Sequence, residues 1–312
     1  MKRSNHCAIN EKDAVKMLIC TEADVTPAVL KVMEQTEDPR LREIMIALIK
    51  HLHGFVRDVR LTEPEFQQAT KLINQLGQFS NDKHNDAVLM AGSLGVSTLV
   101  CLLNNGDNGA TETTQNLLGP FWRMNSPSTK LGGSIVRSET PGTPMRVELT
   151  FLDNSGVPVP DLEVDVWHCS SEGFYENQEE SQADYNLRGK FQTNEEGKIW
   201  FNSVKQSGYP IPTNTGVGPL LEAQNRHPFR PAHLHVLAHK KNYKTLISQI
   251  YSDDDPHLDT DVQFGVTQAL IGKYVHHTEP HPEGLIEGSW YSLNHTLIIE
   301  PGTSVLPIPP IK

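Results

Sequence analysis

Two histidines separated by a single residue are the clearest candidates for chemistry in this chain. Residues 230–235 read Arg-Pro-Ala-His-Leu-His, which places His233 and His235 two positions apart. In a β-strand successive side chains point to opposite faces, so both imidazoles would project from one face and Leu234 from the other. Two imidazoles held side by side can bind a transition metal. The pair alone is equally compatible with polar residues on a solvent-facing strand.

Two tyrosines extend this candidate set. Tyr209 lies in the proline-rich loop at residues 207–212, and Tyr175 ends the segment Trp-His-Cys-Ser-Ser-Glu-Gly-Phe-Tyr. A phenol loses its proton at about pH 10 in water, so a tyrosinate ligand requires a strongly Lewis-acidic ion. Ferric iron meets this need, whereas Zn(II) and Fe(II) favour histidine with carboxylate or cysteine. Two phenols and two imidazoles in one place would therefore favour Fe(III), although each tyrosine alone fits an ordinary packed or turn residue.

The chain before residue 106 has the apolar spacing of helices. Asp38-Pro39 predicts a helix start followed by an apolar stripe at 41–52, and Thr62 predicts a second start with a stripe at 66–76. A third segment, residues 86–103, is apolar on almost every side, which predicts that other helices or a partner chain cover it. We favour a partner chain, because one sheet domain with a few helices leaves little room to bury this segment.

Beyond residue 116 the apolar period changes from helical to alternating, which predicts short strands. Asn194-Glu195-Glu196-Gly197 predicts a hairpin turn between two of these strands. The expected fold is therefore mainly β, with an α-helical N-terminal region and an antiparallel β-sandwich. We predict a helical dimerisation domain at residues 1–106, a linker at 107–116, and a β-sandwich domain with the metal site at 117–312. The alternating stretches are residues 146–152, 163–167, 190–193, 198–201, 233–238, 246–251 and 296–300.

Bulk composition restricts the possible partners. With 312 residues, 37% hydrophobic, the chain is long enough for a sizeable core, and its net charge of −11 argues against nucleic-acid binding. No apolar run approaches the roughly 18 residues that span a bilayer, so we do not expect a membrane protein. The polar N-terminus lacks the apolar core of a secretory signal. Scattered cysteines without C-x-x-C spacing predict reduced thiols and a cytoplasmic location; they are Cys7, Cys20, Cys101 and Cys169.

Taken together, three motifs resemble the intradiol ring-cleavage dioxygenases. They are W-H-x-x-x-x-G-x-Y at 167–175, Y-P-I-P at 209–212 and R-P-A-H-L-H at 230–235. The helical N-terminal region followed by Gly119-Pro120-Phe121 resembles the hydroxyquinol and catechol 1,2-dioxygenase branch, so the likeness covers nearly the whole chain. The resemblance implies a homodimer formed through the N-terminal helices, often with a bound phospholipid. It also implies one Fe(III) per subunit, held by Tyr175, Tyr209, His233 and His235.

The resemblance further assigns roles around the iron. Tyr209 would leave the metal as a catechol-type substrate binds as a chelating dianion, and would take up one of its protons. Arg230 would stabilise electron density that builds up on the ring, and Gln249 would assist this step. The iron-activated ring would then react directly with O2 and open to a dicarboxylate. The substrate pocket would be lined by Gly119, Pro120, Phe121, Ile211, Pro212, Arg230, Leu99 and Cys101.

Within this branch the motifs favour hydroxyquinol (benzene-1,2,4-triol) as substrate, giving 3-hydroxy-cis,cis-muconate or maleylacetate. Gly119-Pro120-Phe121-Trp122 resembles hydroxyquinol enzymes, and residues 258–266 resemble the hydroxyquinol and chlorocatechol lineage. Val100-Cys101 departs from the Val-Asp of relatives, so catechol and chlorocatechol stay alternatives. Two other classes also stay open. One is an Fe(II) oxygenase in which Asp253 or Glu222 joins the two histidines, and the other is a β-sandwich binding module without enzymatic activity.

Overall fold

The computed structural model describes residues 18–81, 85–105, 110–111, 113–282, 284 and 286–310. The chain divides into two compact units at residues 1–71 and 72–312, and the boundary falls inside helix α3 (Glu63–Phe79). Some of the predictions fall outside the described residues. They concern Cys7, the N-terminal segment considered as a secretory signal, and residues 107–109 and 112 of the predicted linker. The assignment of residues 1–106 to a dimerisation domain stays a prediction.

The first unit is helical. Helix α1 spans Glu22–Met33 and helix α2 spans Pro39–Asp58. Helices α2 and α3 begin where the sequence predicts, at Asp38-Pro39 and after Thr62. The Asp38 carboxylate accepts bonds from the Arg40 and Leu41 amides at 2.8 and 2.9 Å, and proline at the first helical position needs no such partner. Thr62 and Glu65 form the corresponding capping contacts before α3. None of the residues of α2 is buried within this chain.

The apolar segment 86–103 forms two helices instead of one. Helices α4 (Asp86–Ser93) and α5 (Val96–Asn105) are bent against each other by 78°. The bend lies at Gly95, whose φ of +72° favours glycine. Most of α4 is buried, whereas the apolar side chains of α5 are largely exposed. In the part of the chain that the structure describes, no single helix is long and apolar enough to cross a membrane, and only this bent pair passes that test when joined.

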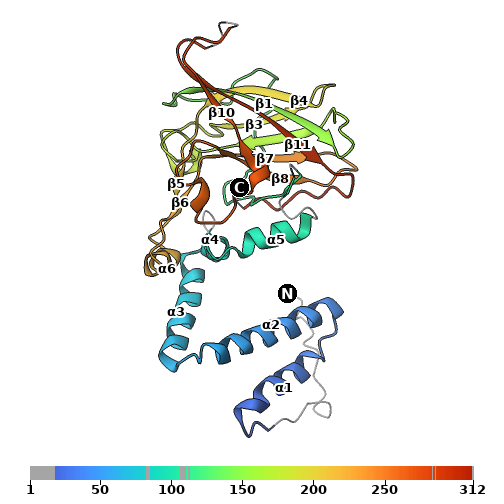
Figure 1. Ribbon diagram of the computed structural model, residues 1–312, viewed down its shortest axis with the longest axis vertical. Helices are drawn as coiled ribbons and strands as arrows, with labels where there is room; N and C mark the ends of the chain where they lie inside the picture. The colour runs from blue at the N-terminus through green and yellow to red at the C-terminus, as the bar shows by residue number, and fades with distance from the viewer. Residues whose placement is uncertain are drawn as a thin grey trace, which may run out of the picture. The chain divides into compact units, whose positions relative to one another are not determined.

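The second unit is built on two stacked sheets (Figure 1). One sheet has the strand order β10-β11-β1-β4 and the other β3-β2-β7-β8-β9, while β5 and β6 form a separate two-stranded ribbon. The strands are β1 (Pro144–Asp153), β2 (Glu163–Trp167), β3 (Arg188–Gln192), β4 (Lys198–Val204), β5 (Tyr209–Pro210), β6 (Phe229–Arg230), β7 (His233–His239), β8 (Leu246–Ser252), β9 (Ile271–Gly272), β10 (Tyr274–His277) and β11 (Trp290–Ile299). Most pairs are antiparallel, but β1–β11 and β8–β9 are parallel. The sheets are therefore mixed, which corrects the expectation of a strictly antiparallel sandwich.

The prediction that the turn at residues 194–197 joins two paired strands is wrong. The turn itself forms, because the Gly197 amide donates to the Asn194 carbonyl at 2.9 Å and Gly197 has a φ of +69°. However, β3 pairs with β2 and β4 pairs with β1. The turn therefore carries the chain from one sheet to the other. Turn residues report the local backbone shape, and they do not identify the partner of the strand that follows.

The apolar core lies between the two sheets, and β7 lines it with only one of its faces. Leu234 and Val236 are fully buried in this core together with alternate residues of β1. Side chains alternate along a strand, so His233 and His235 lie on the outer face of the five-stranded sheet. Both histidines are nevertheless only 1% exposed. Other parts of the chain must therefore cover this outer face, and they build the candidate site.

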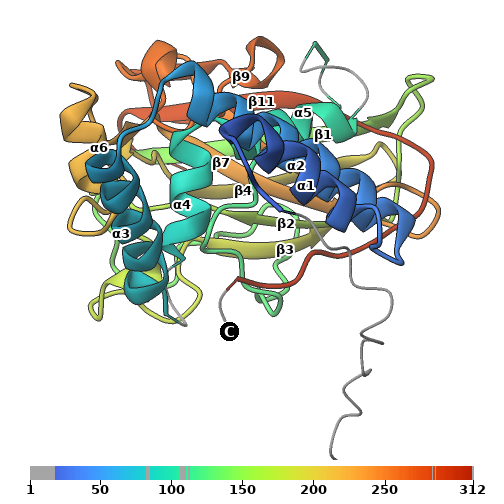
Figure 2. The same ribbon diagram turned by 90° about the horizontal axis from the view of Figure 1, so that it is seen from below.

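A second apolar cluster joins α4 to helix α6 (Val217–Ala223) and to the C-terminal half of α3 (Figure 2). Leu89 and Met90 of α4 pack there with Ile211, which follows β5. The buried Asp86 carboxylate accepts a bond from the Gly216 amide at 3.0 Å, so the start of α4 is fixed to the start of α6. These helices thus hold the long loop between β5 and β6 in place.

Candidate metal centre

The four predicted metal ligands come together on the outer face of the five-stranded sheet. The ring centroids of His233 and His235 lie 4.8 Å apart, and the Tyr209 ring lies 5.6 Å from that of His233. The Tyr175 ring lies 6.3 Å from that of His235, and the two phenol oxygens are 3.5 Å apart. Three segments that are distant in the sequence therefore place two phenols and two imidazoles around one point.

Strand pairing fixes where these side chains lie. His235 of β7 is opposite Trp167 on β2 and Gln249 on β8. Tyr209 is opposite Arg230 in the β5–β6 ribbon, so both residues are brought to the site by one hairpin. The loop before Tyr175 passes close to Tyr209 at Gly173, where φ is +87° and an added Cβ would lie 2.9 Å from the Tyr209 Cβ. A larger residue at 173 would displace the candidate ligand.

Both imidazoles are neutral and keep a nitrogen available. The His233 Nδ1–H donates to the Pro231 carbonyl at 2.7 Å, which leaves the lone pair on Nε2. Burial and the charge of Arg230 lower the pKa of His233 to about 3. Burial and, to a smaller extent, the neighbouring His233 lower the pKa of His235 well below its usual value. The His235 ring stacks on Trp167 at 4.6 Å, and its Nδ1 has no hydrogen-bond partner among the described residues. A neutral imidazole that donates its N–H to a carbonyl, as His233 does, is the usual form of a metal-binding histidine.

The surroundings of the two tyrosines favour the neutral phenol, so a bound cation is needed to stabilise the phenolate. Tyr175 is fully buried and Tyr209 is 9% exposed. Burial raises the pKa of both hydroxyls, while the charge of Arg230 opposes this increase in the pKa of Tyr209. Their separation of 3.5 Å is long for a hydroxyl–hydroxyl hydrogen bond. Two hard oxygens and two imidazole nitrogens fit a ferric ion, whose charge would stabilise both phenolates.

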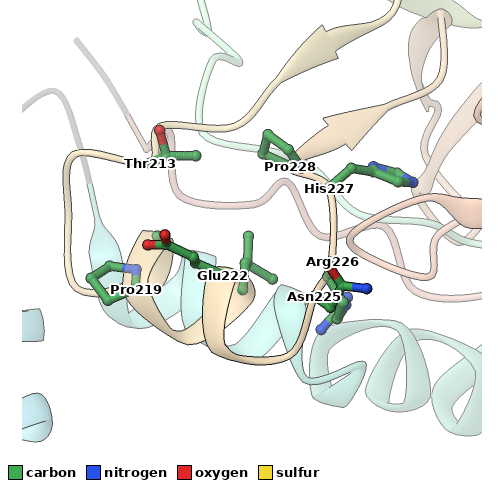
Figure 3. A pocket seen from close by; sticks show the side chains of 9 residues that line it. Thr213, Pro219, Glu222, Asn225, Arg226, His227 and Pro228 are labelled. Atoms are coloured by element: carbon green, nitrogen blue, oxygen red, sulfur yellow. The ribbon is translucent and has the colours of Figure 1, made fainter.

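The alternative Fe(II) site is not formed. Across the described residues, no three side chains of His, Cys, Asp or Glu are placed to hold a metal ion together. One Asp253 carboxylate oxygen instead accepts a bond from the Tyr274 amide at 2.9 Å. Glu222 is exposed on α6, where it lines a surface cavity of about 640 Å³ (Figure 3). The two-histidine, one-carboxylate interpretation is therefore wrong.

Arg230 is fixed beside the candidate ligands by a buried polar network. Its Nε and Nη2 donate to the two carboxylate oxygens of Asp261 at 3.2 Å each. Nη2 also donates to Gln249 Oε1 and to the Tyr251 hydroxyl at 3.0 Å. Nη1 lies 3.4 Å from His233 Nε2. The structure thus brings Arg230 and Gln249 to the site. Asp261 and Tyr251 were not predicted, because no local spacing connects either residue to Arg230.

The predicted pocket residues fall into two groups. Phe121 stacks on Tyr175 with ring centroids 4.3 Å apart, and a Cβ added to Gly119 would lie 3.1 Å from His235 Cε1. Exposed Pro120 lies between these two residues, and exposed Pro212 follows the buried Ile211 next to Tyr209. Leu99 and Cys101 lie on α5, outside the buried aromatic cluster around the candidate ligands. Their part in substrate binding stays a prediction.

The surface cavity in Figure 3 adjoins this site without containing a candidate ligand. Thr213 and Pro228 form one wall, and Pro219 and Glu222 of α6 form the other. The Ile211 amide donates to the Pro228 carbonyl at 3.0 Å, so the cavity begins where the β5–β6 ribbon ends. The chemistry predicted from Tyr209 and the histidines therefore belongs to the neighbouring buried cluster.

Comparison with known proteins finds similar chains among the dioxygenases. The family model described as "Dioxygenase" matches residues 117–293, and "Catechol dioxygenase N terminus" matches residues 38–111. A hydroxyquinol 1,2-dioxygenase from a Rhizobium strain is 38% identical over 86% of this chain and 91% of its own length. A catechol 1,2-dioxygenase from Candida albicans is 35% identical over 75% and 78% of the two chains. The solved structure of hydroxyquinol 1,2-dioxygenase from Pseudomonas putida DLL-E4 has a TM-score of 0.82 and 32% identity, covering 90% of this chain and 98% of that one.

Proposed function

We propose that this chain, which belongs to the intradiol ring-cleavage dioxygenases in the hydroxyquinol and catechol branch, cleaves hydroxyquinol with O2 at an Fe(III) site. The family uses non-haem iron. In this proposal Tyr175, Tyr209, His233 and His235 hold one ferric ion. The observation that carries the proposal is the convergence of these two phenols and two neutral imidazoles at one buried point next to Arg230. The similarity to ring-cleavage dioxygenases over most of the chain argues against the non-enzymatic binding module.

When bound, Fe(III) would hold the catechol oxygens of the substrate and make the ring reactive towards O2. Tyr209 would take up a proton of the substrate at its phenol oxygen, since burial raises the pKa of this hydroxyl and so favours its protonated form. The guanidinium of Arg230, held by Asp261, would stabilise negative charge on the ring. Gln249 would fix Arg230 through its carbonyl oxygen, while its amide donates to the Leu117 carbonyl at 2.6 Å.

The proposed product is a ring-opened dicarboxylate, 3-hydroxy-cis,cis-muconate or maleylacetate. The similarity to hydroxyquinol dioxygenases over most of the chain supports hydroxyquinol as substrate. The similarity to a catechol dioxygenase keeps catechol as an alternative, and the motif at residues 258–266 keeps chlorocatechol as another. An oxygen-electrode assay with hydroxyquinol, catechol and 4-chlorocatechol tests the proposal, with each product identified by its ultraviolet spectrum. We expect the highest kcat/KM with hydroxyquinol. Faster cleavage of catechol would show that catechol is the preferred substrate instead of hydroxyquinol. The absence of oxygen uptake with all three compounds would refute the proposed function.

We further propose a homodimer formed through the N-terminal helices. Five apolar side chains of α2 recur on one helical face at about 50% exposure each; they are Leu41, Ile44, Leu48, Leu52 and Phe55. An exposed apolar stripe of this length is typical of an interface. Size-exclusion chromatography with light scattering should give twice the mass of the chain. A cytoplasmic location and a phospholipid bound at this interface also stay proposals, and lipid extraction with mass spectrometry tests the latter.

A further inference from the structure

Arg188 is a second buried arginine next to the candidate metal centre, and the proposed chemistry does not use it. It is the first residue of β3 and is 1% exposed. Strand pairing places it opposite Trp167, the residue whose indole stacks on His235. Arg230 contacts the part of the site formed by Tyr209 and His233, whereas the neighbours of Arg188 contact Tyr175 and His235.

The guanidinium of Arg188 connects two segments that both hold Tyr175. Its Nε donates to Glu176 Oε1 at 2.7 Å, and Glu176 directly follows Tyr175 in the chain. Its Nη1 donates to the carbonyl of Phe121, whose ring stacks on the Tyr175 ring at 4.3 Å. One side chain thus fixes both the backbone that follows the candidate ligand and the aromatic ring that covers it.

Stability alone gives a weak reason for this arrangement. Arg188 and Glu176 are 1% and 2% exposed, so both charges lose most of their hydration. Apolar side chains of similar volume often replace a buried ion pair without loss of stability. In addition, Arg188 Nη2 is buried and has no hydrogen-bond partner among the described residues. A buried arginine with one unused donor is better explained by the position that it gives to its neighbours.

We propose that Arg188 is a positioning residue for the iron site: by binding Glu176 and the Phe121 carbonyl it fixes the direction of the Tyr175 phenol towards the metal. This inference rests on the proposed function. Groups around a metal ligand orient the ligand, and their loss typically weakens metal binding or activity about 10–100-fold. The residue is expected to act through Tyr175 without touching the substrate.

The test compares a double variant, Arg188→Met with Glu176→Gln, with the single variant Arg137→Met. The double variant removes both buried charges together, so no carboxylate is left buried without its closest cation. Arg123, which also pairs with Glu176 Oε1 at 3.0 Å, keeps its ion pair with Asp184. Arg137 is an exposed control: it donates to the Arg188 and Tyr185 carbonyls and to Thr129, so its loss affects the neighbouring backbone without removing a group that contacts Tyr175. The readouts are iron affinity by chelator competition, the visible absorption of tyrosinate bound to Fe(III), and kcat and KM for hydroxyquinol.

We expect the double variant to bind iron about 10–100-fold more weakly, with a shifted visible absorption and a lower kcat. Arg137→Met should keep the iron affinity and absorption of the unsubstituted protein. The inference is overturned if the double variant matches the unsubstituted protein, or if Arg137→Met causes the same change, since a general loss of packing would then explain both. An unsubstituted protein that binds no iron overturns the proposed function together with this inference.

Arg188→Lys decides the matter if the double variant does not fold. Lysine keeps a positive charge for Glu176, but its single ammonium group cannot reproduce the two-directional contact of a guanidinium. We expect a folded protein with a shifted visible absorption and a smaller loss of iron affinity. A spectrum identical to that of the unsubstituted protein would contradict the positioning role.

Discussion

The two faces of β7 differ in every respect except burial. Towards the sandwich core the strand presents Leu234 and Val236, which are fully buried among other apolar side chains. On the outer face it presents His233 and His235, which are equally buried but surrounded by phenols, an indole and an arginine. Burying polar groups costs free energy unless they find partners, whereas burying apolar groups provides the main driving force for folding. One face of the strand therefore contributes to stability, and the other carries the candidate metal ligands.

This difference predicts that substitutions on the two faces of β7 affect different properties of the protein. Changes on the inner face should lower the free energy of unfolding and leave the metal site intact in the molecules that stay folded. Changes on the outer face should remove iron or turnover with less loss of stability, because the polar groups buried there carry a desolvation cost that offsets part of their contacts. The predictions below test this separation, beginning with the largest expected effect.

Tyr175→Phe should nearly abolish activity. The substitution removes one oxygen and keeps the ring that stacks on Phe121, so the fold should be unaffected. We expect strongly reduced iron content and a loss of turnover of more than about 100-fold, beyond what residues outside the ligand set usually cause. Iron analysis and oxygen uptake measure both quantities. Normal iron content with normal turnover would remove Tyr175 from the ligand set.

Tyr209→Phe should separate iron binding from turnover. Three ligands would remain, so we expect retained iron with an altered colour. Loss of the phenol oxygen that takes up a proton should slow turnover by about 10²-fold or more. Visible absorption and kcat, measured on the same preparation, test this result. Unchanged kinetics would refute the role of Tyr209 as the proton acceptor.

Leu234→Ala is the corresponding test of the inner face. It should lower the free energy of unfolding by about 2–5 kcal/mol, because it leaves a cavity between the two sheets. Iron content and kcat per folded molecule should stay close to those of the unsubstituted protein. Denaturant unfolding and metal analysis give the two values. Loss of iron from protein that is still fully folded would show that the two faces of β7 are not independent.

His168 predicts a smaller, pH-dependent effect. Its Nδ1–H donates to the Cys169 carbonyl and its Nε2 accepts from the Ser203 hydroxyl, both at 2.7 Å, so the neutral ring satisfies both contacts. Burial lowers its pKa from 6.5 to about 4. The unfolded chain then binds the proton first as the pH falls, so stability is full above pH 6.5 and decreases towards pH 4, by up to about 3 kcal/mol.

Denaturant unfolding between pH 7.5 and 4.5 measures this effect, with His168→Gln as the comparison. Glutamine retains one donor and one acceptor but does not titrate, so its stability should fall less steeply over this range. Asp165 acts in the opposite direction in both proteins, because burial raises the pKa of its carboxyl to about 6. Parallel curves for the two proteins would show that His168 does not contribute to the loss of stability in acid.

The sequence predicted those features of the fold that local patterns determine. Alternation in β7 placed His233 and His235 on one face and Leu234 on the other, and Asp38-Pro39 identified the start of α2. Pairing partners were harder to predict. The Asn194–Gly197 turn was found, but the strands on either side of it belong to different sheets. Likewise, no local signal shows that β1 pairs in parallel with β11, a strand almost 150 residues away.

The same limit applies to the site. The four candidate ligands were predicted because their motifs resemble a known family, and the structure places them together. Asp261, Tyr251 and Arg188 were missed, since each acts on the site through a contact made only after the strands pair. In α4 and α5 the apolar pattern concealed a break, because Gly95 changes the direction of the backbone without changing the hydrophobicity.

The most direct test of the account is a metal analysis of the purified protein together with its visible spectrum. Two phenolates bound to one ferric ion should give close to one iron per chain and a red-brown colour from charge transfer between tyrosinate and Fe(III). Loss of that absorption on removal of iron, and its return when Fe(III) is added, would support the N2O2 site. A colourless protein that binds stoichiometric zinc or Fe(II), or that binds no metal after incubation with Fe(III), would contradict it.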